Sequence, residues 1–192
     1  HTSLHHLHVI LYCHSLLVYA VAAVLNYSHD ITAAASIAGF NAPMGILFER
    51  ATKMMGAFAY LEYPFLWAYQ TMLFGRAARL TAVDGINSAD TAVMIIHGDK
   101  DTTVSYDRAS IIAHKGEITN PNVVYKTCTA ENHNGHRNLF RSEAAAEYIN
   151  EENRVYQELY DFYNGSIPDD VLASYYADVD RAQASELDAG FM

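Results

Sequence analysis

The sequence has few cysteines and few basic residues. Its 192 residues include 2 cysteines and 12 lysines or arginines, against 22 aspartates or glutamates. Two cysteines cannot form the disulfide framework of a small secreted domain. Together with the missing signal-peptide pattern at the start, they favour a cytoplasmic location. The positive charge is too sparse for a basic stripe, so we expect no nucleic-acid partner.

Several motifs that would indicate a cofactor-binding or metal-binding site are also absent from the sequence. The sequence contains no phosphate-binding glycine loop, no His-Glu-x-x-His and no Cys-x-x-Cys. We therefore expect no cofactor and no metal. Four of the ten histidines fall within the first eight residues. A metal site at His5, His6 and His8 is a minor alternative, because such sites need further ligands in a defined geometry, and we favour an incidental or non-native start.

The residues that are present describe a globular chain. With 51% hydrophobic and 18% charged residues, it has the composition of a single folded domain over residues 1–192. The formal charge of -10 is concentrated after residue 140, where twelve acids accompany three arginines. The apolar run over 7–25 has the length of a membrane span, but His8 and His14 interrupt it. A strand followed by a buried helix explains the same composition, so the pattern argues against membrane association.

Apolar runs and helical patterns alternate along the chain, which predicts an α/β fold with a mostly parallel sheet flanked by helices. We expect the strands over 9–12, 30–39, 92–96 and 122–127. Aromatic residues crowd a helical stretch over 44–80, in which Pro64 is expected to start or kink a helix. Further helices are expected over 106–115 and 142–164, and a capping-box variant at 166–169 predicts one more.

The stretch over 93–104 organises this pattern. It reads Val-Met-Ile-Ile-His-Gly-Asp-Lys-Asp-Thr-Thr-Val, a buried strand followed by two acids. An acid just beyond the carboxyl end of a parallel strand lies where α/β folds keep ligands and catalytic groups. Asp99 and Asp101 also suit an ordinary turn, and this alternative stays open on the local sequence.

Two other strand ends carry reactive side chains. The first strand leads into Cys13-His14-Ser15-Leu16-Leu17 and then an apolar helical run, the context of a nucleophile elbow. Ser15 as a plain helix N-cap is the alternative. After the last strand, a polar loop contains His133 and Gly135-His136 before the next helix. A solvated loop histidine is the alternative for either of these.

Taken together, these motifs resemble the α/β-hydrolase superfamily, most closely its esterase-like and prolyl-oligopeptidase-like members. The order Ser, acid, His is the order that this family uses. The resemblance implies Ser15 as nucleophile, Asp101 as triad acid and His136 as base. It further implies the Leu16 N–H as one oxyanion donor, substrate-lining residues Phe40 and Asn41, and a helical cap or lid over 44–88.

The resemblance has two departures. The family commonly has Gly-x-Ser-x-Gly at the elbow, whereas Cys13 and Leu17 stand at the glycine positions here. Only 14 residues precede Ser15, so we expect the chain to correspond to the carboxyl-terminal part of the fold and to lack the loop that gives the second oxyanion donor. A sheet shortened in this way exposes an edge through which we expect a homodimer to form.

Two hypotheses of different classes follow. The first is a serine hydrolase that cleaves a small carboxylic ester, thioester or amide through Ser15, Asp101 and His136. The second is a non-catalytic fragment or pseudoenzyme that keeps the hydrolase scaffold. The altered elbow favours the second, and the intact acid and histidine motifs favour the first.

Overall fold

The structure is a computed structural model that describes residues 9–14, 19–20, 23–27 and 31–190. It divides into two compact units. The sheet unit comprises the described residues up to 129 together with 134–136, and the helical unit comprises 130–133 and everything described from 137 onward. Each unit is described by itself.

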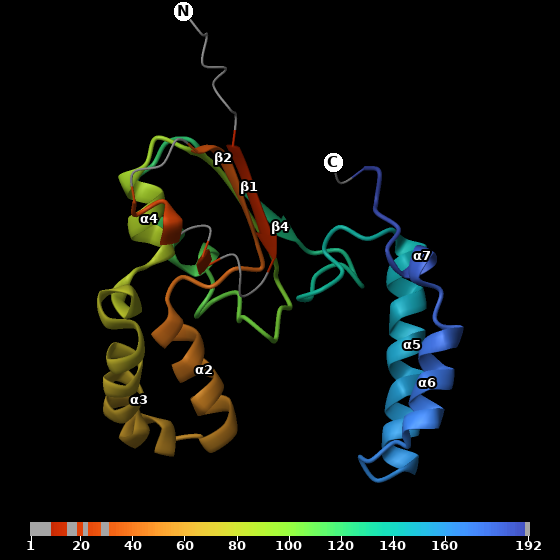
Figure 1. The fold of residues 1–192 in the computed structure, drawn as a ribbon. Coiled ribbons are helices and arrows are strands. Elements are labelled where there is room, and N and C mark those ends of the chain that lie inside the picture. Colours follow the sequence, from red (N-terminus) through yellow and green to blue (C-terminus); the bar gives the residue numbers. More distant parts are fainter. Residues whose placement is uncertain (1–8, 15–18, 21–22, 28–30, 191–192) are drawn as a thin grey trace, which may run out of the picture. The chain divides into compact units, whose positions relative to one another are not determined.

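Four parallel strands form the centre of the sheet unit (Figure 1), in the spatial order β1-β2-β3-β4. Their bounds are β1 Val9–His14, β2 Ile31–Ile37, β3 Ala92–Gly98 and β4 Val123–Cys128. All four expected strands are thus confirmed within two residues at every end, and so is the parallel α/β architecture. Both cysteines are free, in β1 and at the end of β4.

One face of this sheet carries the core. Strands that follow one another in the same direction, joined by right-handed crossovers, place their connections on one face. Ile86 and Ile111 in these connections are fully buried, as is Ile95 on β3. The cluster they form is completed by Leu25, Ala34, Ala82, Val93 and Ile112.

The opposite face of the sheet is exposed within the sheet unit. Side chains alternate along a strand, and Ile10 and Tyr12 on β1 are 68% and 58% exposed, while Val124 on β4 is 60% exposed. Parallel sheets are normally buried on both faces. Apolar side chains therefore lie exposed on this face within the sheet unit.

A long helical segment connects β2 to β3. It consists of α2 Pro43–Met55, α3 Phe58–Phe74, the 3-10 turn η1 Gly75–Arg79 and α4 Ala82–Ser88. The predicted helical stretch is therefore confirmed. Pro64, however, lies inside α3 and does not start a helix. α2 and α3 pack through Phe48, whose ring meets the edges of Tyr60 and Tyr63 at centroid distances of 5.1 and 5.0 Å.

The segment after β3 differs from the prediction. Residues 102–109 form turns, and only η2 Ile112–Glu117, a 3-10 helix, follows. The expected α-helix over 106–115 is therefore wrong. Carboxylates accept the backbone N–H groups of Thr103, Val104, Ser105 and Ala109, and such bonds compete with the helical ladder.

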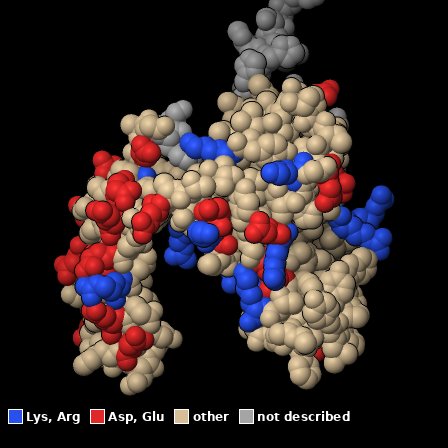
Figure 2. Space-filling model, turned by 180° about the vertical axis from the view of Figure 1, so that it is seen from behind, with Lys and Arg blue, Asp and Glu red and all other residues tan. Residues whose placement is uncertain are grey.

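Three helices form the helical unit: α5 Glu143–Phe162, α6 Asp169–Asp178 and α7 Arg181–Ala184. Ser142 caps α5 by accepting a hydrogen bond from the N–H of Ala145, so the predicted helix is confirmed. The helix predicted to begin at 166–169 is confirmed as α6, but it begins after Pro168 without a side-chain cap, so the capping box itself is wrong. Acidic side chains cover much of this unit's surface in Figure 2, in line with the charge of the carboxyl-terminal sequence.

α3 is the most apolar helix in the part of the chain that the structure describes, yet neither it nor any other described helix has both the length and the apolar character to cross a bilayer.

Candidate active site

The carboxyl ends of the four strands place the candidate site. Because the strands are parallel, residues that follow each of them gather at one edge of the sheet. His14 ends β1, Phe40 and Asn41 follow β2, Asp101 follows β3, and His136 follows β4. Residues far apart in the sequence therefore meet at this edge.

Asp101 and His136 form a buried hydrogen-bonded pair. The Nδ1 atom of His136 lies 2.7 Å from Oδ2 of Asp101. The Asp101 side chain is fully buried, and that of His136 is 11% exposed. An ionised carboxylate only accepts, so Nδ1 carries the proton, and Nε2 is the basic nitrogen of the neutral ring. This is the tautomer that a general base requires.

Three further donors hold the Asp101 carboxylate. Its Oδ1 atom accepts the N–H groups of Thr103 at 2.7 Å and Val104 at 2.9 Å. Burial alone raises the pKa of the Asp101 carboxyl, but the hydrogen bonds from His136, His97 and the Val104 N–H outweigh it and hold the pKa well below its usual range. Asp101 is therefore ionised at neutral pH, and hydrogen bonds to both of its carboxylate oxygens fix its orientation.

His97 is the third of these donors, and the sequence analysis assigned it no role. Its side chain is fully buried at the end of β3, and its Nε2 atom lies 2.9 Å from the Val104 carbonyl and 3.2 Å from Oδ2 of Asp101. Both neighbours are acceptors, so Nε2–H donates to them. The spacing of four residues between His97 and Asp101 was visible in the sequence, but a strand followed by a turn gives no periodicity from which to infer the contact.

His14 connects the end of β1 to the histidine loop. Its Nε2 atom lies 2.8 Å from the backbone carbonyl of His136, and the two rings are 5.1 Å apart between centroids. His14 is therefore the side chain through which β1 contacts His136. Ser15 and Leu16, the predicted nucleophile and oxyanion residue, lie outside the described residues, and so does Leu17.

Gly98 lets the histidine loop lie directly on the end of β3. A Cβ atom at this position would lie 2.2 Å from the Asn134 carbonyl oxygen and 2.5 Å from that of Gly135. The same Asn134 carbonyl accepts the N–H of Lys100 at 2.8 Å. This close contact fixes the loop that carries His136.

His133, the second histidine of the predicted loop, belongs to the helical unit. Its Nδ1 atom donates to the Asn138 carbonyl, and its Nε2 atom lies 2.8 Å from a Glu143 carboxylate oxygen. Hydrogen bonds from Asn132 and His133 lower the pKa of Glu143. Both ring nitrogens of His133 are thus occupied by groups other than Asp101, and His136 is the histidine that pairs with the acid.

Phe40 and Asn41 follow β2 and are both buried. The Phe40 ring stacks on Tyr19 at 5.2 Å and lines an apolar pocket of about 510 Å³ with Pro43, Ile46 and Phe74. Asn41 accepts the N–H of Val83 through Oδ1. Asn41 thus holds the start of α4 in place, and its role in binding substrate remains a prediction.

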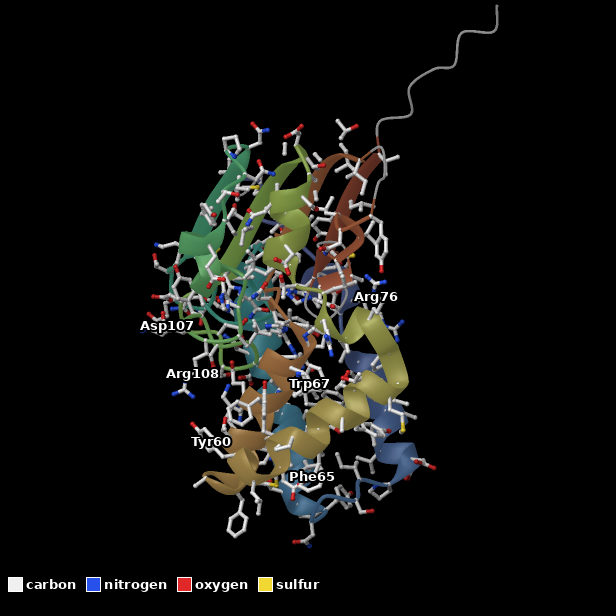
Figure 3. The ribbon with its side chains drawn as sticks, turned by 90° about the vertical axis from the view of Figure 1, so that its left-hand side faces the viewer. Tyr60, Phe65, Trp67, Arg76, Asp107 and Arg108 are labelled. Carbon is white, nitrogen blue, oxygen red and sulfur yellow. The ribbon has the colours of Figure 1, made fainter. Side chains whose placement is uncertain are left out.

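Glu49 of α2 holds the loop that follows Asp101. It is 4% exposed, and its Oε1 atom accepts the Ser105 hydroxyl at 2.6 Å and pairs with Lys53 at the same distance. Lys53 also donates to the Thr102 carbonyl. Burial alone would raise the pKa of Glu49. The hydrogen bonds from Lys53 and Ser105 outweigh this effect, so the pKa lies below its ordinary value. Asp107 and Arg108, labelled in Figure 3, lie on the exposed side of the same loop.

No group of three or more His, Cys, Asp or Glu side chains is arranged to hold a metal ion among the described residues. The histidines of residues 1–8 lie outside that part of the chain. What the site does contain is an oriented acid–histidine pair, which can abstract and return a proton.

Comparison with known proteins gives fold-level likeness only. No protein-family model matches the chain. No curated protein matches it in sequence either. Among solved structures, Pyrococcus horikoshii acylaminoacyl peptidase is similar, at 12% identity and a TM-score of 0.48 over 80% of this chain and 23% of that one.

An esterase from Pyrococcus furiosus is similar as well. In one crystal form it is 18% identical over 68% of this chain and 46% of the esterase, with a TM-score of 0.43. In another the identity is 16% over 80% and 53%, again with a TM-score of 0.43. By their names, these neighbours are a peptidase and an esterase. The chain spans about a quarter of the peptidase and about half of the esterase.

Proposed function

We propose that the chain is a serine hydrolase that acts on a carboxylic ester, thioester or amide through Ser15, Asp101 and His136. The observation that carries the proposal is the 2.7 Å contact between Asp101 and Nδ1 of His136, which sets the histidine up as a base. His14, the residue directly before Ser15, contacts the backbone of His136. This contact supports the proposal because it brings the end of β1 to the acid–histidine pair.

The proposed chemistry uses each residue in one role. Ser15 Oγ attacks the carbonyl carbon while His136 Nε2 takes its proton, and the Leu16 N–H donates to the oxyanion. Collapse of the tetrahedral intermediate breaks the bond to the leaving group, which receives the proton from His136. Water then attacks the acyl-enzyme by the same route, and Asp101 holds the imidazole in one tautomer throughout.

Cys13 stands at the first glycine position of the proposed nucleophile elbow, so its packing indicates whether the elbow can form without that glycine. At the strand position before His14, the small Cys13 side chain packs against the apolar core cluster. This supports the view that Cys replaces the first glycine without disturbing β1.

Leu17, at the second glycine position of the proposed elbow, argues against an active elbow. A branched side chain at the second glycine position favours the alternative function, a non-catalytic scaffold. The lid over 44–88, which contains α2 and α3, is part of the first proposal, because Phe40 and residues of both helices line the same apolar pocket.

Labelling with a fluorophosphonate probe tests the proposal. We expect the purified chain to be labelled, and Ser15→Ala and His136→Ala to lose the label. His133→Ala is the control for His136, because His133 contacts Asn138 and Glu143 instead. Ser166→Ala, at an exposed serine after α5, is the control for Ser15.

The controls are expected to keep the label. A folded wild-type chain that resists the probe would refute the hydrolase and favour the non-catalytic scaffold. Labelling that survives in Ser15→Ala would show that another residue is the nucleophile.

A further inference from the structure

α3 exposes apolar side chains on a scale that is unusual for a surface helix. Of its 17 residues, all of which the structure describes, only Ala59 is buried. Phe58, Phe65 and Met72 are 72%, 67% and 75% exposed. A helix that is apolar on all sides is normally covered by protein. α3 therefore lacks its covering within the sheet unit.

The exposed residues of α3 include one continuous face. Tyr60 and Tyr63 point toward Phe48 of α2. Residues three or four apart fall together on the other side of the helix. We name this the outer α3 face, and it consists of Phe58, Leu61, Phe65, Tyr69 and Met72. Figure 3 labels Phe65 on this helix, together with Tyr60 and Trp67.

The area of this surface matches that of a protein interface. Each of its members is more than half exposed, and Met54 and Leu73 beside it are exposed as well. A fully exposed aromatic side chain presents about 150–250 Å², so the five partly exposed members present roughly 650 Å² and, with Met54 and Leu73, a patch on the order of 800 Å². The largest patch on a typical monomer is about 300–600 Å². A stable dimer needs about 800 Å² from each partner, which this extended patch provides.

Charges near the two ends of the face suit a second copy of the same chain. Glu62, the only charged residue of α3, lies in its first third, and Arg76 follows its end. In an antiparallel pair of α3 helices, the end that carries Glu62 lies beside the end of the other helix that is followed by Arg76. A two-fold axis gives this arrangement twice.

A lipid surface fits the same face less well. Helices that lie in a membrane interface carry lysines and arginines along a polar face. α3 has no basic residue between Phe58 and Phe74, and the chain as a whole has a formal charge of -10. Figure 2 shows the end of the α2–α3 pair seen from behind as an area with very few charged side chains. A protein surface of the same composition is the better complement.

We infer that the outer α3 face is the interface of a homodimer in which two α3 helices pack antiparallel. The inference is independent of the proposed hydrolase activity. It is also distinct from pairing through the edge of the sheet, because it places the contact on a helix. The dimer covers the apolar residues that the sheet unit leaves exposed.

Sedimentation equilibrium of the full chain tests this inference. We expect a dimer at micromolar concentration. Phe65→Asp, Glu62→Arg and Arg76→Glu are each expected to weaken it at least about tenfold, because they place a desolvated charge or a like-charge pair in the interface. The double variant Glu62→Arg/Arg76→Glu restores the charge pairing and is expected to restore the dimer. Phe162→Asp, at a residue of α5 that is 77% exposed, is the control and leaves the dimer unchanged.

Three outcomes would overturn the inference. The first is a wild-type chain that is monomeric at all concentrations. The second is a dimer that survives Phe65→Asp and both charge reversals, which would locate the interface elsewhere. The third is a monomer that binds phosphatidylcholine vesicles through Phe65, which would identify lipid as the occupant. Circular dichroism of every variant separates loss of association from loss of folding.

Discussion

Oδ2 of Asp101 accepts a hydrogen bond from Nδ1 of His136 at 2.7 Å, across 35 residues of sequence. The two residues follow neighbouring parallel strands, β3 and β4, so the sheet register brings them together. Both side chains are nearly or fully buried, which strengthens the bond relative to one in water.

Asp101→Asn tests the direction of the hydrogen bond. An amide can donate to Nδ1, which would move the ring proton to Nε2 and remove the general base. We expect hydrolysis of a p-nitrophenyl ester and the rate of fluorophosphonate labelling to fall on the order of 10³–10⁴-fold. Asp99→Asn is the control, because Asp99 lies in the same turn and Asp101 is the acid that accepts the hydrogen bond from His136. Wild-type rates in Asp101→Asn would contradict the assignment of Asp101 as triad acid.

His97 is expected to act as a positioning residue for Asp101. His97→Phe removes the donor and leaves the Asp101 carboxylate with one hydrogen bond fewer. The loss of a bond to a charged group corresponds to about a ten- to hundredfold decrease in kcat. KM is expected to stay constant, because His97 is fully buried and does not reach the substrate.

The conservative variant His97→Gln separates positioning from packing. Its amide N–H can replace the Nε2–H donor, so it should recover most of the lost kcat. If Phe and Gln at position 97 reduce kcat equally, or if KM rises with either, the effect is structural and the positioning role is refuted.

The sequence was a good guide to the strands and to the order of the polar groups behind them. β3 is a continuous apolar run and β4 is short and rich in β-branched residues, and both patterns are typical of strands. Asp101 and His136 were located for the same reason, since they directly follow those strands. Helix α5 was recognisable from the helical spacing of its apolar residues.

The turns after Asp101 could not be predicted in this way. Residues 106–115 have helical composition. The segment forms turns because Asp101, just before it, accepts the N–H of Val104, and Glu49 of α2 accepts the N–H of Ala109. Glu49 lies 56 residues from Ser105 in the chain, and no local pattern reports such a contact. The bond from His97 to Asp101 was missed because a buried histidine inside an apolar strand looks the same whether it packs or donates.

Gly98→Ala tests how closely the histidine loop lies on β3. A methyl group would meet the Asn134 carbonyl at 2.2 Å, and its neighbours there are backbone atoms that cannot rotate away. We expect a shift of the loop that carries His136, with labelling reduced at least about tenfold and stability reduced by about 1–3 kcal/mol. Gly116→Ala, where a Cβ meets nothing within 4 Å, is the control. Equal behaviour of the two variants would show that the loop has room for a side chain.

The contribution of Glu49 to the free energy of unfolding should depend on pH in the acidic range. Bonds from Lys53 and Ser105 lower the pKa of Glu49 below the value of about 4.3 that a glutamate has in an unfolded chain. Between these two values the unfolded state binds more protons, so the contribution is complete above about pH 4.3 and is lost as the pH falls below it. Urea unfolding of the wild type and Glu49→Gln should therefore differ by about 1–3 kcal/mol at pH 6 and converge toward pH 3. Glu147→Gln, at an exposed position on α5, should show no such convergence. A constant difference across this range would mean that the Glu49 charge does not hold the Asp101 loop, and that the loop depends on packing alone.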